Sequence, residues 1–210
     1  MSQVKLIHST PNGDNLISYM ARVSNPANQS NTETSGKLIS YLIKHKHWSP
    51  FEMVNMCVEI HTTRSIAQQI LRHRSFSFQE FSQRYAQVVE PSVIPDLRRQ
   101  DSKNRQNSID DLDDYTKQDL QLKAQYVFDQ AMMLYNEMIS AGVAKECARD
   151  VLPLSTPTKM YMNGSLRSWI HYCDLRCGNG TQLEHKIIAD QCKELIIQQF
   201  PLVSEALGYV

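Results

Sequence analysis

The densest cluster of chemically capable side chains lies between residues 72 and 84. It combines guanidinium, hydroxyl, imidazole, amide and carboxylate groups: Arg72, His73, Arg74, Ser75, Ser77, Gln79, Glu80, Ser82 and Arg84. Arginine forks suit bidentate binding of phosphate, and serine hydroxyls add neutral donors. A solvated basic turn is the ordinary explanation of such a run, but aromatic residues interleave with it: Phe76, Phe78, Phe81 and Tyr85. We therefore predict a pocket wall that binds phosphate through the arginines and stacks a planar group on the rings.

Glycine usage and net charge limit the alternatives. With 7 glycines, the chain has neither a GxGxxG nor a GxxxxGK[ST] motif, which excludes a Rossmann or P-loop nucleotide site at the motif level. Lys+Arg and Asp+Glu both number 22, and a net charge of zero argues against a general nucleic-acid coat or a membrane-surface protein. A module that binds single-stranded nucleic acid through the Arg/Phe cluster remains an alternative function.

Two further polar groups lie outside this cluster. His45 and His47 form an HxH pair, but without a third ligand nearby they are more typical of a helix end than of a metal site. We predict no metal site, and a metal-dependent hydrolase is a weaker alternative. The downstream group pairs charged residues at helical i, i+3 and i, i+4 spacings: Glu146, Arg149, Arg167, His171, Asp174 and Arg176.

The cysteines and the hydropathy indicate where the protein works. Five cysteines, an odd number without framework spacing, indicate a reducing compartment. No apolar run approaches the roughly 20 residues of a membrane span, and the first residues lack the apolar core of a signal peptide. We expect a cytoplasmic protein that has no membrane partner.

A longer pattern gives a family resemblance. Arg72-His73-Arg74, followed by seven residues and Ser82, resembles the signature of the flavin-dependent thymidylate synthases. Other segments resemble blocks of the same family: ARVS (21–24), HWSPFE (47–52), Gln69, ECARDVLPL (146–154) and LRSWIHYCDLR (166–176). These blocks are spread over most of the chain, outside the segment 91–114 and the extreme C-terminus.

The resemblance implies a methyltransferase reaction and its cofactors. dUMP would be reductively methylated to dTMP, with 5,10-methylenetetrahydrofolate as carbon donor, FAD relaying hydride from NADPH, and tetrahydrofolate released. It also implies a mixed, non-Rossmann fold and a homotetramer whose active sites are shared between subunits. The partners would be the small molecules dUMP and folate, with no nucleic acid.

Residue roles follow from the resemblance position by position. The positions that would hold dUMP are Gln69, Arg72, Glu80, Ser82, Arg84, Arg149 and Arg176. The positions around FAD would be His47, Ser49, Arg72, His73, Arg74, Glu80, Ser165, Arg167 and His171. Ser165 stands where an asparagine is common, and Asn163 is a possible substitute. Arg149 would come from a different subunit than the signature loop.

The resemblance makes Arg176 the catalytic residue. Uracil C5 is a poor nucleophile, and a fixed guanidinium in a desolvated site activates it by stabilising negative charge on the ring. The signature contains no cysteine, so covalent activation by a thiolate has no obvious residue there. Ser82 as a nucleophile is disfavoured, because no histidine stands at a clear activating position.

The elements that position these residues are predicted from hydrophobic periodicity. We expect a single α+β domain over 1–210, mostly helical with a small, mainly antiparallel sheet and a polar excursion at about 91–114. Strands are expected at 4–7, 54–60 and 85–89. Helices are expected at 15–23, 38–43, 66–71, 122–139 with a closing Gly142, 145–152, 163–176, and from 183 to about 196 after a Thr181/Glu184 capping box.

Overall fold

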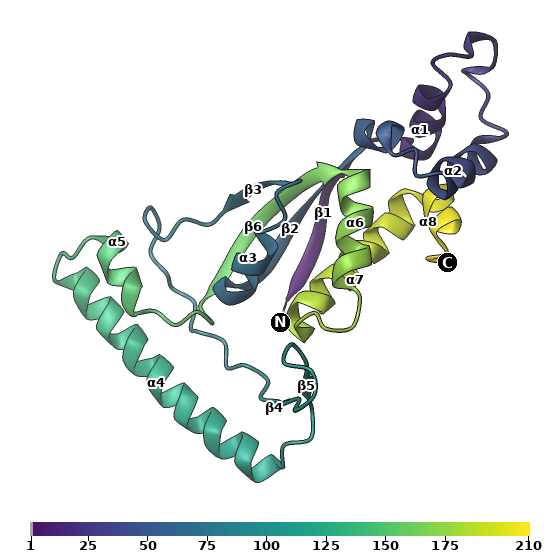
Figure 1. The fold of residues 1–210 in the computed structure, drawn as a ribbon. Helices are drawn as coiled ribbons and strands as arrows, with labels where there is room; N and C mark the ends of the chain where they lie inside the picture. Colours follow the sequence, from purple (N-terminus) through teal and green to yellow (C-terminus); the bar gives the residue numbers. More distant parts are fainter. Residues whose placement is uncertain (1) are drawn as a thin grey trace.

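The computed structural model describes residues 2–210 and is mostly helical with a small antiparallel sheet, which confirms the predicted α+β class (Figure 1). The main sheet has the strand order β1-β2-β6-β3, with every neighbouring pair antiparallel. Its strands are β1 (Gln3–Ser9), β2 (Asn55–Thr63), β3 (Ser77–Glu80) and β6 (Pro157–Ser165). The α-helices are α1 (Gly13–Ala21), α2 (Ser35–Lys44), α3 (Arg64–Ile70), α4 (Asp114–Ser140), α5 (Lys145–Ala148), α6 (Leu166–Arg176), α7 (Leu183–Gln199) and α8 (Pro201–Leu207).

One face of the sheet carries the hydrophobic core. Met56, Val58 and Ile60 alternate along β2 and are fully buried, as the period-2 pattern predicts. Met160 and Met162 of β6 extend the same buried face. Helices α3, α6 and α7 pack against the sheet and against one another (Figure 1). Because these helices pack on the sheet, the sheet sets the positions of the C-terminal ends of α3 and α6. Both of these ends carry predicted site residues.

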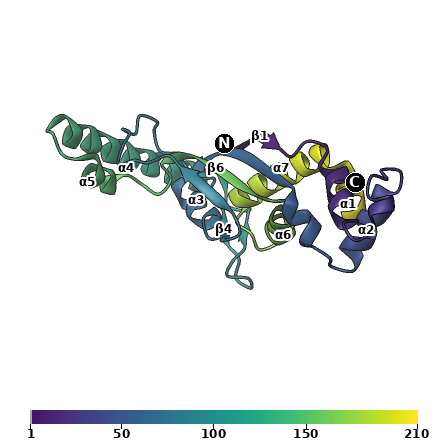
Figure 2. The same ribbon diagram turned by 90° about the horizontal axis from the view of Figure 1, so that it is seen from above.

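A helical layer closes one end of the molecule. Helices α1, α2 and α8 pack together there with the 3₁₀ turn η2 (Ser49–Met53) (Figures 1 and 2). The buried carboxylate of Asp14 accepts hydrogen bonds from the backbone N–H groups of Leu202 and Val203, at 2.9 and 3.3 Å. These bonds satisfy orphan donors in the first turn of α8. They tie the C-terminal helix to the N-terminal one.

The long helix α4 leads away from the sheet at the other end (Figures 1 and 2). Asp113 caps its first turn by accepting from the N–H of Thr116 at 2.9 Å. Gly142 follows its C-cap with φ of +85°, the left-handed conformation that the predicted closing glycine requires. A small separate cluster holds α4 to the body: the hydroxyl of buried Tyr135 accepts from the N–H of Val88 at 3.0 Å.

Several sequence-based boundaries are wrong: α4 begins at Asp114 and not at 122, α5 ends at Ala148 and not at 152, and three further differences have a specific physical cause. The expected strand 85–89 is irregular, because the Val88 N–H bonds the Tyr135 hydroxyl, and the edge strand is β3 instead. The expected helix 163–176 begins later, because residues 163–165 complete β6 and Ser165 is the N-cap of α6. The expected capping box at Thr181 is absent: Gln182 is the N-cap of α7, and Thr181 donates to the carbonyl of Leu175.

The predicted excursion 91–114 contains only a minimal hairpin. Its two strands are β4 (Arg99–Gln100) and β5 (Ser108–Ile109), paired antiparallel. Arg99 stabilises it through two hydrogen bonds to the carboxylate of Asp111, at 2.8 and 2.6 Å. Just before the hairpin, Arg98 donates to Glu184 of α7 at 2.7 Å, which fastens the excursion to the body.

Candidate functional site

Arg176 and His73 form a direct pair between the end of α6 and the loop after α3. The Nε of Arg176 donates to the Nε2 of His73 at 2.9 Å. Burial, followed by the positive charges of Arg176 and His171, lowers the pKa of His73 from 6.5 to about 4. The ring is therefore neutral at pH 7, with Nε2 as acceptor and the proton assigned to Nδ1. The contact occupies Nε of the guanidinium and not its two Nη groups.

An aromatic wall stands behind His73. Phe76 packs edge-on against Trp169 and Tyr172, with ring centroids 4.8 and 6.0 Å apart. Gly164 of β6 makes room for it, because a Cβ there would lie 2.5 Å from the Phe76 Cδ1 atom. The prediction that Phe76 stacks on a ligand is wrong: the ring belongs to the core and supports His73, whose ring centroid lies 6.4 Å away.

The other aromatic rings of the signature divide between the core and the surface. Phe78 is half-buried and packs against the core. Phe81 and Tyr85 are exposed, Tyr85 to 83%. Of the four rings, these two are the ones available for stacking.

His185 of α7 is a buried residue that the sequence interpretation missed. Its side chain is fully buried, with Nε2 3.1 Å from the hydroxyl of Tyr172 and Nδ1 3.3 Å from Oε1 of Gln69. Burial, followed by the charge of Arg176, lowers its pKa from 6.5 to about 3. Periodicity could have found it, since it precedes Ile188 by three residues and Cys192 by seven, on the buried stripe of the helix.

A cavity of about 440 Å³ lies beside α6 on the side of η2. Two residues predicted to contact the flavin, Arg167 and His171, line it together with Trp48 and Glu52. His47 and Ser49 flank Trp48 in the chain, and both are exposed. A guanidinium, an imidazole and a flat indole suit an anionic group attached to a planar one, so these residues fit part of a dinucleotide such as FAD.

Ser165 is connected to this cavity by a hydrogen bond to Glu52, one of the residues that line it. Its hydroxyl donates to Glu52 Oε2 at 2.5 Å and accepts from the N–H of Ser168, while Arg167 donates to Glu52 Oε1 at 2.7 Å. The hydrogen bond from Ser165, together with Arg167, holds the pKa of Glu52 below its usual value. Asn163 lies two residues earlier on β6, and its Oδ1 is buried with no hydrogen-bond partner among residues 2–210.

A second group of predicted residues gathers where β3 ends. Glu80 accepts from the hydroxyl of Thr158 at 2.9 Å. In the turn that follows, Ser82 Oγ accepts from the N–H of Arg84 at 3.4 Å. Arg84 then forms an ion pair with Glu146 of α5, with Nη2 to Oε2 at 3.0 Å. Arg149 comes three residues after Glu146, in the 3₁₀ turn η3 (Arg149–Val151), so the Arg84–Glu146 pair brings the segment that carries Arg149 to the end of the signature in the same chain.

The structure thus separates the predicted dUMP residues into two groups. Gln69, Arg72 and Arg176 lie where α3 and α6 end, whereas Arg84 and Arg149 lie at α5. In both views α5 lies beside α4, well beyond the ends of the strands, whereas α6 packs against the sheet (Figures 1 and 2). Among residues 2–210, no hydrogen bond or ion pair joins Gln69, Arg72 or Arg176 to Arg84 or Arg149.

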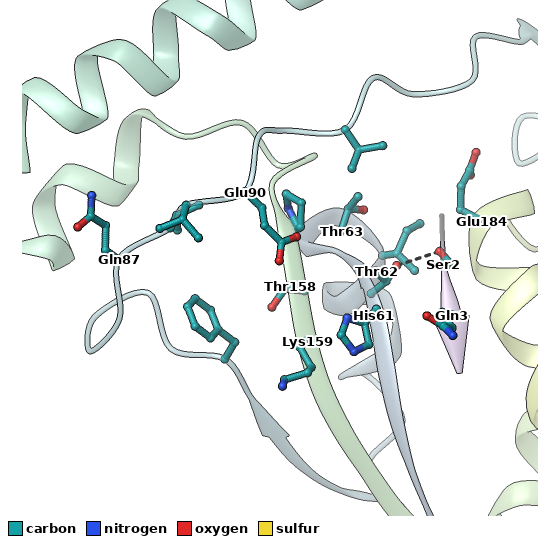
Figure 3. Close-up of a pocket in the computed structure, with 16 residues that line it drawn as sticks. Ser2, Gln3, His61, Thr62, Thr63, Gln87, Glu90, Thr158, Lys159 and Glu184 are labelled. Carbon is teal, nitrogen blue, oxygen red and sulfur yellow. Dashed lines mark hydrogen bonds between the residues drawn. The ribbon is translucent and has the colours of Figure 1, made fainter. Parts of the chain in front are cut away.

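A larger cavity, of about 520 Å³, opens beside the second group (Figure 3). The end of β2, the starts of β1 and β6, and the segment after the signature enclose it, with Gln87, Glu90, Thr158 and, from α7, Glu184 around it. Thr158 also holds Glu80, so the cavity adjoins a predicted substrate residue. The sequence did not predict it, because its walls come from segments far apart in the chain.

Two other features bear on function. Among residues 2–210, no three His, Cys, Asp or Glu side chains come close enough together to hold a metal ion. His45 is the C-cap of α2 and packs on Tyr41, with ring centroids 4.3 Å apart. Over the same residues, no helix is long and apolar enough to cross a membrane.

Comparison with known proteins identifies the family of the chain. The family model of the thymidylate synthase complementing proteins matches residues 5–202. A probable flavin-dependent thymidylate synthase of Paramecium bursaria Chlorella virus 1 is 50% identical over 205 residues, covering 98% of this chain and 95% of the viral protein. The chain belongs to the flavin-dependent thymidylate synthase family. A second member, from Synechocystis sp., is 52% identical over 196 residues, covering 93% of this chain and 90% of its own.

Solved structures related to this flavin-dependent thymidylate synthase family share the fold. A UMP/dUMP methylase, PolB from Streptomyces cacaoi, bound with 5-Br dUMP superposes with a TM-score of 0.88 at 26% identity, covering 100% of this chain and 95% of that one. The same methylase bound with 5-Br UMP gives a TM-score of 0.89. The family resemblance and the non-Rossmann α+β fold predicted from the sequence are both confirmed.

Proposed function

We propose that this protein reductively methylates dUMP to dTMP, with 5,10-methylenetetrahydrofolate as carbon donor and NADPH as reductant through FAD. The observation that carries the proposal is the Arg176–His73 pair: a permanent positive charge held at 2.9 Å by a neutral imidazole. An ionised pyrimidine needs such a charge, and a guanidinium cannot be titrated away. The comparisons support the same reaction, since curated relatives are named flavin-dependent thymidylate synthases.

Arg176 would act on the pyrimidine through its two Nη groups. His73 takes the Nε hydrogen and fixes the plane of the guanidinium, so that little reorganisation is needed when charge develops on the uracil ring. A cationic His73 would repel Arg176 and could not accept from it. The low pKa of His73, about 4, therefore supports a positioning role at neutral pH.

The cavity beside α6 would hold part of the flavin. FAD, when bound, supplies the hydride that reduces the transferred carbon. Arg167 and His171 line the cavity, and Ser165 and Arg167 both bind Glu52. We propose that Ser165 contributes to the flavin site through its bond to Glu52, with Asn163, whose buried Oδ1 has no partner among residues 2–210, as the alternative contact.

We propose a homotetramer with shared sites, and we propose that the site is divided between subunits at a different point than the resemblance implies. Arg84 and Arg149 stand together in one chain through Glu146, so the division runs within the signature: Gln69, Arg72 and Arg176 from one subunit, Glu80 to Arg84 and Arg149 from another. Uncovered apolar side chains on α4 support an oligomer: Tyr115, Leu122, Tyr126, Val127, Met133 and Leu134.

The remaining proposals concern organisation and location. We propose that residues 1–210 form a single domain, supported by one large core that receives residues from β1 to α8. All five cysteines are free, which supports a reducing, cytoplasmic environment. Nothing in residues 2–210 favours the single-stranded nucleic-acid module, because Phe76 and Phe78, two of the four rings it would stack bases on, serve the core.

A visible spectrum of the purified protein, followed by an activity assay, tests the proposal. We expect an oxidised flavin spectrum, and dTMP formation only when dUMP, methylenetetrahydrofolate and NADPH are all supplied. The control omits one component at a time. A colourless protein that takes up no added FAD would contradict the proposed cofactor, and a yellow protein that makes no dTMP would contradict the proposed reaction.

A further inference from the structure

A continuous series of hydrogen bonds runs from the core to the polar excursion and passes through Gln69. It begins at the Tyr172 hydroxyl, 3.1 Å from His185 Nε2, and continues from His185 Nδ1 to Gln69 Oε1 at 3.3 Å. Gln69 Nε2 donates to Gln182 Oε1 at 2.7 Å, and Gln182 Nε2 donates to a carboxylate oxygen of Glu184 at 2.9 Å. Segments far apart in the sequence therefore meet at one amide, that of Gln69.

The direction of every bond in this series is fixed from its outer end. An ionised carboxylate only accepts, so Gln182 must present its NH₂ to Glu184 and its Oε1 to Gln69. Gln69 must then present its NH₂ to Gln182 and its Oε1 to His185. His185 must carry its proton on Nδ1, and its Nε2 must accept from the Tyr172 hydroxyl. One acidic side chain thus sets the orientation of two amides and one imidazole.

Arg98 keeps that acidic side chain ionised and in place. Burial alone would raise the pKa of Glu184, but the hydrogen bond and charge of Arg98 lower it below its ordinary value. The Arg98–Glu184 pair is 2.7 Å long, and the Arg98 side chain is only 10% exposed. A charge-assisted bond in such a site is stronger than a neutral one. The excursion 91–114 therefore has a structural connection to Gln69.

We propose that Glu184 and His185 are positioning residues that hold the Gln69 amide in one orientation for the nucleotide, with Arg98 supporting Glu184. The inference rests on the proposed function, in which Gln69 holds dUMP. An amide that rotates freely exchanges its donor and acceptor and binds a nucleotide in half of its orientations. An amide held by bonds at both Oε1 and Nε2 presents the same free N–H and lone pair in every molecule.

The first test reads the direction of the bonds without any activity. In the full-length protein labelled with ¹⁵N-histidine, NMR at pH 7 should show His185 as a neutral ring protonated at Nδ1. Glu184→Gln keeps the shape of the side chain but allows it to donate, so the Nδ1-protonated form should give way to a mixture. Glu194→Gln, the same change at an exposed position of α7 outside the series, should leave the ring as it was. An Nε2-protonated or cationic His185 in the wild type would overturn the inference.

The second test measures the dissociation constant of dUMP. Glu184→Gln should raise it by about 3- to 10-fold, the size expected for one displaced hydrogen bond, with a smaller change in kcat. His185→Gln can still donate to Gln69 and accept from Tyr172, so it should bind dUMP nearly as the wild type does. His185→Leu can do neither and should bind more weakly. The two His185 variants keep the test informative should Glu184→Gln fail to fold.

Gln69→Ala distinguishes the proposed role of Gln69 in binding dUMP from the proposed positioning role of Glu184 and His185. If it weakens dUMP binding while Glu184→Gln and His185→Leu do not, Gln69 binds the nucleotide without help, and the positioning role is wrong. If Gln69→Ala leaves dUMP binding unchanged, the proposed role of Gln69 is wrong and the functional half of the inference falls with it. The NMR measurement still decides the direction of the bonds in that case.

Discussion

Replacing Arg176 tests the centre of the proposed chemistry. In Arg176→Ala, the charge near the pyrimidine disappears and His73 Nε2 loses the donor 2.9 Å away. Arg176→Lys keeps a charge, but a lysine ammonium cannot bond His73 and present a planar pair of N–H groups to the substrate at the same time. Both variants should therefore fail in the same step.

The expected loss follows from the contacts available. The Nε bond to His73 leaves two Nη groups for the pyrimidine, and each hydrogen bond from a charged group contributes about 1.5–3 kcal/mol. Removing one such charge-stabilising donor typically costs about 10²–10³ in rate, or roughly 3–4 kcal/mol. Flavin binding should change little, because the cavity beside α6 is lined by Arg167 and His171 and not by Arg176.

The assay follows reoxidation of pre-reduced enzyme with dUMP and methylenetetrahydrofolate, together with the dTMP formed. Arg176→Ala should remain yellow, keep the oligomeric state of the wild type, accept hydride from NADPH, and fall by about 10²–10³ in the reoxidation step. If either variant reoxidises at close to the wild-type rate and yields dTMP, Arg176 is not the activating residue.

Three further predictions concern assembly, substrate binding and pH. Mixing Arg149→Ala with Arg176→Ala should restore activity after subunit exchange, because the two residues come from different subunits. Mixing Arg149→Ala with Arg84→Ala should not, because these two come from the same subunit. Equal recovery in both mixtures would refute the proposed division of the site. Ser82→Ala should lose dUMP affinity more than turnover, and a variant that binds dUMP normally yet is inactive would favour Ser82 as nucleophile. Burial holds the pKa of His185 in the folded protein at about 3. As the pH falls, this imidazole is therefore protonated in the unfolded chain before it is protonated in the folded protein. Protonation of His185 in the unfolded chain should lower the free energy of unfolding by about 2 kcal/mol between pH 7 and 5. Denaturant titrations at the two pH values should show a drop that is smaller by this amount for His185→Gln.

The sequence predicted those elements that depend on neighbouring residues, and it failed for those that depend on contacts between distant segments. The alternation in β2 and the closing glycine of α4 are properties of neighbouring residues, and both predictions were confirmed. The strand expected at 85–89 is absent, and β3 was not expected because it is only four residues long, Ser77–Glu80, and pairs with β6, some 80 positions away. Propensity favoured 85–89, but the Tyr135 hydroxyl from α4 takes the backbone N–H of Val88.

The sequence supplied candidate residues for the site but no indication of how the fold groups them. The signature places Arg72 and Arg84 twelve positions apart, and nothing in that spacing shows that one ends near Arg176 and the other at α5. The role of His185 depends on Gln69, more than a hundred positions earlier. Such pairings are decided by how the helices cross the sheet, which periodicity does not encode.

The contact between Gly164 and Phe76 limits how this protein can vary. A methyl group at position 164 would lie 2.5 Å from the Phe76 ring, and Phe76 cannot retreat because Trp169 stands behind it at 4.8 Å. Any larger residue at 164 would displace the ring, and His73, the partner of Arg176, would lose the edge-on packing of Phe76. Substitution at a strand position with no functional group of its own would thus damage the chemistry, unless a smaller residue first replaced Phe76. The order in which these two positions change is constrained over evolution: the ring must shrink before the glycine can grow.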